Sequence, residues 1–166
     1  MKSGFTLVEL MVVVLLTSVV MSALFMVMSS GRSAWFEADT QVAVQQELRK
    51  AMREMTRELS MSGASQVSVA DDSSIDTSIS FNISNGSTAG GGINWIGPIN
   101  YSVSAGQLLR INGSDTRVLA NNVSSLAFLR ASSPSRLLHI NATVAKNTVG
   151  GRTINVTHEA AVFLRN

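Results

Sequence analysis

The distribution of hydrophobic and polar positions divides the chain into a helical first third and a turn-rich remainder. From Leu10 to Ser30 no residue is charged, and about 20 apolar residues in a helix cross the roughly 30 Å hydrocarbon core of a membrane. Between Phe5 and Ser62 there is no proline and the only glycine is Gly31. The pattern therefore predicts one helix from Phe5 to about Met61, which is about 85 Å long at 1.5 Å per residue.

The second half of the predicted helix is amphipathic. Residues 32–59 carry five basic and five acidic side chains. Among them, apolar residues recur at spacings of four, three and four positions, at Leu48, Met52, Met55 and Leu59. Such a spacing places them on one face of a helix. We expect this stripe to pack against a sheet, while the charged side chains remain in solvent.

The remainder of the chain alternates apolar and polar residues, which is the pattern of half-buried strands. The alternation covers residues 79–83, 99–103 and 138–144, and a mostly apolar strand is predicted at 123–130. Turn signals at Ala105-Gly106, Asn112-Gly113 and Gly150-Gly151 separate these strands. Because a long helix precedes a run of antiparallel strands, the fold class predicted is α+β, with the long N-terminal helix packed on antiparallel β-sheet.

Composition narrows the classes of function. The 166 residues suit one domain with an appendage. The net charge is +2 and the basic residues alternate with acidic ones, so we expect no nucleic-acid site. The chain has no cysteine, which excludes thiol catalysis, cysteine-ligated zinc and disulfides.

Three kinds of segment compete for the apolar region. A secretory signal peptide has an apolar core of about 7–15 residues and a small-residue cleavage site, whereas this region is longer and its best site, Met21-Ser22-Ala23, is poor. A plain membrane anchor accounts for the length. It does not account for Glu9, because a carboxylate adds nothing to an anchor and charge is costly within a bilayer.

The residues around Glu9 favour the third kind of segment. A leader of four residues that includes Lys2 is followed by Phe5-Thr6-Leu7-Val8-Glu9-Leu10, and its last residue is Gly4. This stretch resembles the processing signature of type IV pilin-like proteins, which include type IV pilins and the pseudopilins of type II secretion. The resemblance implies that a prepilin peptidase cleaves between Gly4 and Phe5 and methylates the new amine of Phe5. It also implies that Glu9 pairs with the Phe5 amine of a neighbouring subunit during assembly.

The resemblance also suggests how the chain is divided. The four segments expected are a leader (1–4), a transmembrane and assembly helix (5–30), an amphipathic periplasmic helix (31–62) and a β-rich globular domain (63–166). Trp35 and Phe36 follow the apolar segment closely. Tryptophan is enriched at the membrane–water interface, so these two side chains are predicted to lie there.

No catalytic constellation is visible in the sequence. His139 falls on the polar side of its strand, and His158 shares the side of Val156 and Ala160. We expect the first to be exposed and the second to lie at the edge of the core. The cluster Asp71, Asp72 and Asp76 could offer oxygen ligands to calcium. It lacks the glycine and closing glutamate of a calcium loop, so a solvated turn is favoured, and no cofactor is expected.

Looser similarities concern the type of subunit. Residues 106–110, 118–128 and 162–166 resemble strands of the J-type pseudopilins of type II secretion and of the W-type minor pilins. The function predicted is a minor subunit of a type II secretion pseudopilus. The alternatives are a minor pilin that primes or tips a type IV pilus and, more remotely, a membrane-anchored periplasmic enzyme or sensor. Expected partners are a prepilin peptidase, other pilin-like subunits and an inner-membrane platform. The expected location is the inner membrane, which the chain crosses once, with its C-terminal domain in the periplasm.

Overall fold

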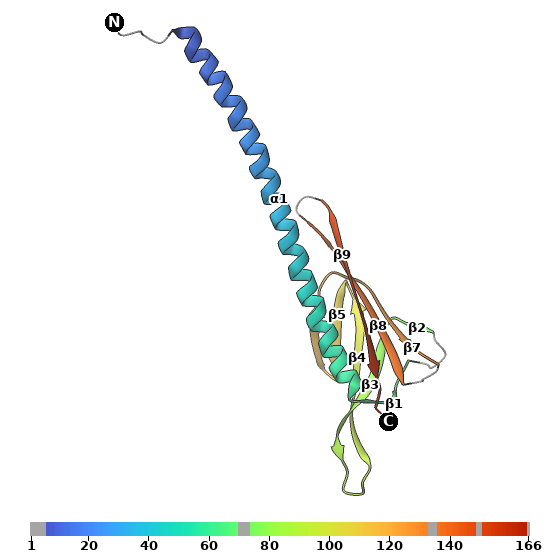
Figure 1. The fold of residues 1–166 in the computed structure, drawn as a ribbon. Helices are drawn as coiled ribbons and strands as arrows, with labels where there is room; N and C mark the ends of the chain where they lie inside the picture. Colours follow the sequence, from blue (N-terminus) through green and yellow to red (C-terminus); the bar gives the residue numbers. More distant parts are fainter. Residues whose placement is uncertain (1–5, 70–73, 133–135, 149–150, 166) are drawn as a thin grey trace. The chain divides into compact units, whose positions relative to one another are not determined.

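The computed structural model describes residues 6–69, 74–132, 136–148 and 151–165. Within these ranges one α-helix is followed by nine β-strands (Figure 1). The predicted α+β class is therefore confirmed. The chain divides into two compact units, residues 1–40 and 41–166.

Helix α1 runs without interruption from Leu7 to Ser60. Its end lies one residue before the predicted end at Met61, and Gly31 does not break it. The division between the two units falls after Thr40. The boundaries of the four segments predicted from the sequence stay a prediction.

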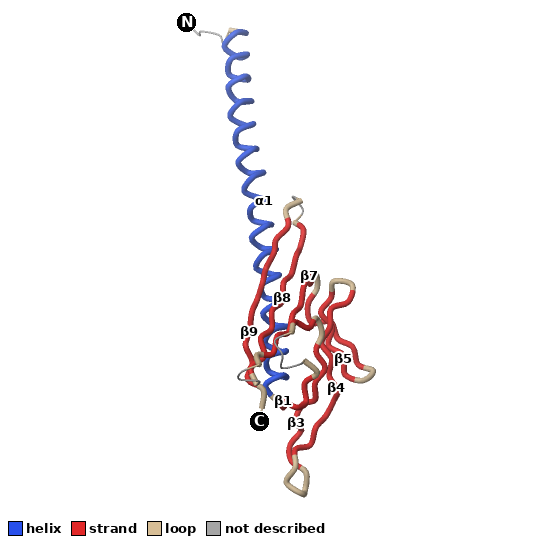
Figure 2. The backbone as a smooth tube through the Cα atoms, turned by 90° about the vertical axis from the view of Figure 1, so that its right-hand side faces the viewer, coloured by secondary structure: helices blue, strands red, loops and turns tan. Residues whose placement is uncertain are grey.

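The strands of the second unit form two antiparallel sheets (Figure 2). The five-stranded sheet has the order β1-β3-β4-β5-β6, and the four-stranded sheet has the order β2-β7-β8-β9. A parallel bridge between Gly63 and Arg165 links the two. The strands are β1 (Ser62–Val67), β2 (Ile75–Asp76), β3 (Ile79–Ser87), β4 (Ile93–Ser104), β5 (Gln107–Asn112), β6 (Asp115–Ala120), β7 (Val123–Arg130), β8 (Leu137–Asn147) and β9 (Thr153–Phe163).

The core of this unit is built from α1 and both sheets. The predicted stripe is confirmed, because Leu48, Met52, Met55 and Leu59 are all buried. They share one cluster with alternate residues of the strands, such as Phe81 of β3, Ile99 of β4 and Leu138 of β8. Burial of each such side chain contributes about 1.5–3 kcal/mol to folding. The stripe thus fixes the face of α1 on which the β-strands assemble.

A two-residue turn between β4 and β5 follows the sequence signal at Ala105-Gly106. Ser104 pairs with Gln107 across it, and both central residues have positive φ, 50° at Ala105 and 74° at Gly106. Two positive φ angles are the mark of a type I′ turn, whose twist matches that of the flanking strands. At the second central position glycine avoids the strain that a side chain meets in the left-handed region, whereas Ala105 carries that strain at the first.

A buried polar cluster joins α1 to the five-stranded sheet, so the expectation that the charged side chains of the helix remain in solvent is wrong for Glu58. The carboxylate of Glu58 accepts a hydrogen bond of 2.5 Å from the Tyr101 hydroxyl of β4. It also accepts bonds from Nε of Arg110 on β5, at 3.1 Å to Oε1 and 3.0 Å to Oε2, and Nη2 of Arg110 lies 3.0 Å from Oε1. Burial first, and then the neighbouring Glu58 carboxylate, raise the pKa of the Tyr101 phenol. The hydrogen bond to Glu58 raises the pKa of Arg110. The cluster therefore consists of an ion pair between Arg110 and Glu58 and a neutral Tyr101 phenol that donates to Glu58.

Candidate functional site

The first turn of α1 is closed by a pair of reciprocal hydrogen bonds between Thr6 and Glu9. The backbone N–H of Glu9 donates to Oγ1 of Thr6 at 3.3 Å, and the backbone N–H of Thr6 donates to Oε2 of Glu9 at 3.0 Å. The Thr6 hydroxyl also donates to Oε2 at 3.1 Å. This arrangement is a capping box, in which two side chains satisfy N–H groups that the helix itself leaves without partners.

The capping box is a feature that sequence reasoning missed. Its signal is present, because a threonine followed three residues later by a glutamate, ahead of an apolar run, marks a helix start. Thr6 and Glu9 have this spacing. Glu9 therefore has a local structural role in addition to the role expected for it in assembly. Both bonds from Thr6 end on one oxygen, Oε2, of the two in the carboxylate.

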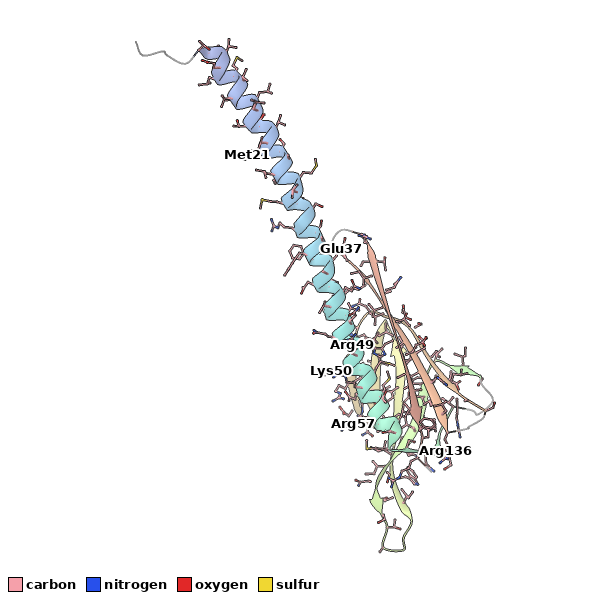
Figure 3. The ribbon with its side chains drawn as sticks, in the orientation of Figure 1. Met21, Glu37, Arg49, Lys50, Arg57 and Arg136 are labelled. Atoms are coloured by element: carbon pink, nitrogen blue, oxygen red, sulfur yellow. The ribbon has the colours of Figure 1, made fainter. Side chains whose placement is uncertain are left out.

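The surface of α1 that follows the cap is apolar on every side. Large hydrophobic side chains are exposed along the whole stretch from Leu7 to Met28 (Figure 3 labels Met21). None of the most apolar window of this helix is buried, and the helix is long and apolar enough to cross a membrane. Water disfavours such an extended apolar surface, so either lipid or the helices of other subunits must cover it.

The few polar side chains within this stretch are satisfied by the helix itself. The hydroxyl of Thr17 donates to the carbonyl oxygen of Val13 at 2.8 Å. Ser18 donates to Leu15 and Ser22 donates to Ser18, each at 2.8 Å. Because an unpaired polar group in hydrocarbon costs several kcal/mol, these bonds let the segment sit among lipid chains or other apolar helices.

The other residues predicted from the sequence are placed as follows. Trp35 and Phe36 lie on α1 and are 74% and 57% exposed, and their location at a membrane interface stays a prediction. Gly4, Phe5, Asp71 and Asp72 lie outside the described residues. Asp76 belongs to β2 and pairs with Phe128 of β7.

The two histidines of the chain lie on neighbouring strands of the four-stranded sheet. His139 is exposed on β8 and His158 is half-buried on β9, as expected from their phases. Across the part of the chain that the structure describes, no group of three histidine, aspartate or glutamate side chains could hold a metal ion. The weak calcium candidate is not tested by this, because Asp71 and Asp72 fall in an undescribed segment.

Comparison with protein families identifies a known motif at the N-terminus. Residues 1–25 match the family model described as the prokaryotic N-terminal methylation motif. The chain carries the type IV prepilin signature. The prepilin signature implies processing by a prepilin peptidase and assembly with other pilins. No curated protein and no solved structure matches the chain.

Proposed function

We propose that this chain is a minor structural subunit of a type II secretion pseudopilus, assembled through its N-terminal helix. The observation that carries the proposal is that the prepilin signature at residues 1–25 begins a helix whose apolar side chains are exposed on every side. Such a surface needs a lipid or protein environment. A subunit that starts in the inner membrane has its apolar helix covered by lipid, and after it joins a fibre the helices of other subunits cover it.

The proposed processing step is compatible with the helix start. Cleavage between Gly4 and Phe5 would remove the leader and leave Phe5 as the new N-terminus. The capping box needs the N–H and hydroxyl of Thr6 and the carboxylate of Glu9, and the cut removes none of these. The mature helix can therefore keep its cap with the Phe5 amine directly before it.

Glu9 would then serve assembly as well as capping. A carboxylate carried into an apolar bundle needs a charged or hydrogen-bonding partner. The methylated amine of Phe5 in a neighbouring subunit supplies one, since α-amino groups have an unperturbed pKa of about 8 and are largely cationic at neutral pH. One oxygen of the carboxylate can hold the cap while the other faces the neighbour. In this way the pairing would set the position of one subunit along the next.

The proposed location and partners follow from this path. The chain would span the inner membrane once, with its N-terminus cytoplasmic and its C-terminal domain periplasmic, and would join other pilin-like subunits on an inner-membrane platform. It would act by assembly rather than by catalysis. The loose likeness of residues 106–110, 118–128 and 162–166 to J-type pseudopilins is the support for type II secretion.

The proposal is tested by the mass of the mature protein and by its neighbours. In cells with an active prepilin peptidase we expect a chain that begins at Phe5 and carries a methyl group on its amine. An intact Met1 under these conditions would refute the processing. Cross-linking of the mature chain in its native cells should recover other subunits of a secretion pseudopilus, whereas recovery of type IV pilus subunits would assign it to that machine.

A further inference from the structure

Glutamates and arginines lie on different sides of α1 within the second unit. The acidic residues Glu47, Glu54 and Glu58 follow one another at spacings of seven and four, which is one line along a helix. Each is paired beside the five-stranded sheet. Glu47 accepts from Asn121, Glu54 pairs with Arg117, and Glu58 pairs with Arg110. The alternation of charges seen in the sequence is therefore not an alternation in space.

Three arginines line another flank, beside the four-stranded sheet. Arg49, Arg53 and Arg57 follow at spacings of four, and they border a groove of about 560 Å³ together with His158 and Ala160 of β9. All three arginines are exposed, and Figure 3 labels two of them, Arg49 and Arg57. With the acidic side chains of this helix segment engaged elsewhere, the groove between α1 and β9 is cationic.

Strand β9 is the edge of its sheet, and its pairing with β8 shows which groups face outward. Just beyond the strand ends, Leu164 N–H donates to Arg136 and Thr148 N–H donates to Arg152. Since hydrogen-bonded pairs alternate in an antiparallel ladder, the even-numbered residues of β9 bond to β8. The N–H and C=O groups of the odd-numbered residues point away from β8, at Thr153, Asn155, Thr157, Glu159, Ala161 and Phe163.

No described strand pairs with this outward edge. The sheet order ends at β9, and among the described residues no backbone hydrogen bond outside the β8–β9 ladder involves residues 153–163. The Glu159 carbonyl oxygen lies 3.2 Å from Nδ1 of its neighbour His158. The inward side chains of β9 are covered only in part. Val156 and Ala160 are half-buried, whereas the residues that pair with them on β8, Val144 and Ile140, are buried.

We propose that the free edge of β9 accepts an extended acidic segment of another polypeptide, which adds to the sheet as a further strand and points alternate carboxylates at Arg49, Arg53 and Arg57. The added strand would bond to the outward N–H and C=O groups of β9 and cover its half-buried inward face. Strand addition of this kind obtains affinity from the main chain and specificity from alternate side chains. The inference goes beyond the proposed function and does not rest on it.

The spacing of the arginines matches a strand. Residues four apart in a helix are about 6 Å apart along its axis, and alternate residues of a strand are about 6.7 Å apart. Figures 1 and 2 both show β9 running beside the C-terminal part of α1. Three successive inward side chains of an added strand can therefore each face one arginine of the row Arg49, Arg53 and Arg57.

Charge also argues against the two other occupants of this edge. If β9 paired with β9 of a second copy, the two arginine rows would be brought together without anions between them, and like charges repel. A nucleic acid would neutralise the arginines, but its phosphates only accept hydrogen bonds, so the outward C=O groups of β9 would lack the N–H donors that a polypeptide supplies. An acidic strand satisfies both the main chain and the charges.

The test uses the full chain in uncharged detergent micelles and synthetic probe peptides. The probe is a peptide of eleven residues, the length of β9, with alternating glutamate and valine. One control replaces each glutamate by lysine. A second control keeps the glutamates but carries N-methyl groups on the backbone, so that it cannot donate strand hydrogen bonds. Binding is measured by titration, and amide hydrogen exchange is measured at single-residue resolution.

We expect the glutamate probe to slow exchange at the odd-numbered amides of β9, such as Thr157 and Glu159. Both control peptides should bind at least about tenfold more weakly. Arg53→Glu should weaken the glutamate probe about threefold to tenfold, because an exposed ion pair contributes less than a factor of ten. The matched control Lys50→Glu lies on the same helix but does not border the groove, so it should change binding less than about twofold.

Four results would overturn the inference. Equal binding of the glutamate probe and its N-methylated form would mean that the arginines attract anions without strand addition. A thymidine oligonucleotide that binds more tightly than the glutamate probe would mean the same. If the lysine probe bound as tightly as the glutamate probe, the arginines would play no part in recognition. Protection of the odd-numbered amides before any peptide is added, with dimers in solution, would identify a second copy as the occupant.

Discussion

Removal of the Glu58 carboxylate is the change that most sharply tests how α1 is held in the second unit. Glu58 is only 8% exposed and accepts hydrogen bonds from Tyr101 and Arg110. In Glu58→Ala, both donors remain in place without an acceptor. Breaking a buried ion pair by removing one partner costs about 3–5 kcal/mol, and an unsatisfied buried hydroxyl costs about 1–3 kcal/mol.

The expected loss is about 3–4 kcal/mol, because the Arg110 side chain is still 13% exposed and can recover some hydration. The matched control is Glu54→Ala on the same helix line. Its partner Arg117 has a side chain that is 55% exposed, so that pair should contribute less than about 1 kcal/mol.

Urea denaturation of the full chain in detergent micelles, followed by the circular dichroism of the sheets, measures both losses. The fitted slopes should agree between variants, so that a change in midpoint reports a change in stability. If Glu58→Ala cost no more than Glu54→Ala, the polar cluster would not anchor the helix and the reasoning would be wrong.

Three further predictions concern the same unit. Tyr101 is the only tyrosine and burial raises its phenol pKa. Its contribution to stability should thus be complete below about pH 10 and should fall as pH rises toward the folded-state pKa; a tyrosinate absorbance titration should show delayed ionisation in the folded chain and ordinary ionisation in urea. Leu48→Ala, at a fully buried position, should cost about 2–5 kcal/mol in urea denaturation, whereas Val42→Ala at an exposed position should cost less than about 0.5 kcal/mol. Gly106→Val should cost about 1–2 kcal/mol, because φ at this position is 74°, and the cost should be absent if the turn can change its type.

Periodic features of the chain could be predicted from the sequence because one physical cause produces each of them. The stripe from Leu48 to Leu59 is buried as its spacing predicts, and Ile79, Phe81, Leu138 and Ile140 lie inside as their alternation predicts. In each case the side chains that leave water are the apolar ones at helix or strand spacing. Local periodicity was therefore enough for the fold class.

Features that depend on partners far apart in the chain could not be predicted. Strand β1 has a mixed composition, and β2 is only two residues long, so neither has a pattern of its own. The division of the strands into two sheets depends on pairings between distant segments. Glu58 is hydrogen-bonded to Tyr101 and Arg110, which lie 43 and 52 residues further along the chain, and no local sequence pattern predicts such a contact.

The candidate site was predicted in part. The sequence pointed to Glu9 through a resemblance, whereas the structure adds the hydrogen bonds to Thr6. The signal for these bonds, a threonine three residues before a glutamate, lies within four residues of the sequence. The spacings of the glutamates and of the arginines on α1 are present in the sequence, but which sheet lies beside each row depends on contacts between distant segments.

Two variants separate assembly through the N-terminal helix from capping of that helix. Glu9→Gln removes the charge but keeps a side chain that also forms capping boxes. Thr6→Val removes the capping hydroxyl but keeps the carboxylate. If Glu9 pairs with a neighbour's Phe5 amine, only Glu9→Gln leaves a buried charge without its partner, which costs at the lower end of about 3–5 kcal/mol.

The deciding measurement is the amount of each processed variant that co-purifies with the other fibre subunits. We predict that Glu9→Gln falls more than about tenfold below the unchanged chain, since each 1.4 kcal/mol is a factor of about ten. Thr6→Val should stay within about threefold, because a helix cap contributes about 0.5–2 kcal/mol and its loss only frays the first turn. Recovery of Glu9→Gln at the level of the unchanged chain, with normal processing, would contradict assembly through Glu9.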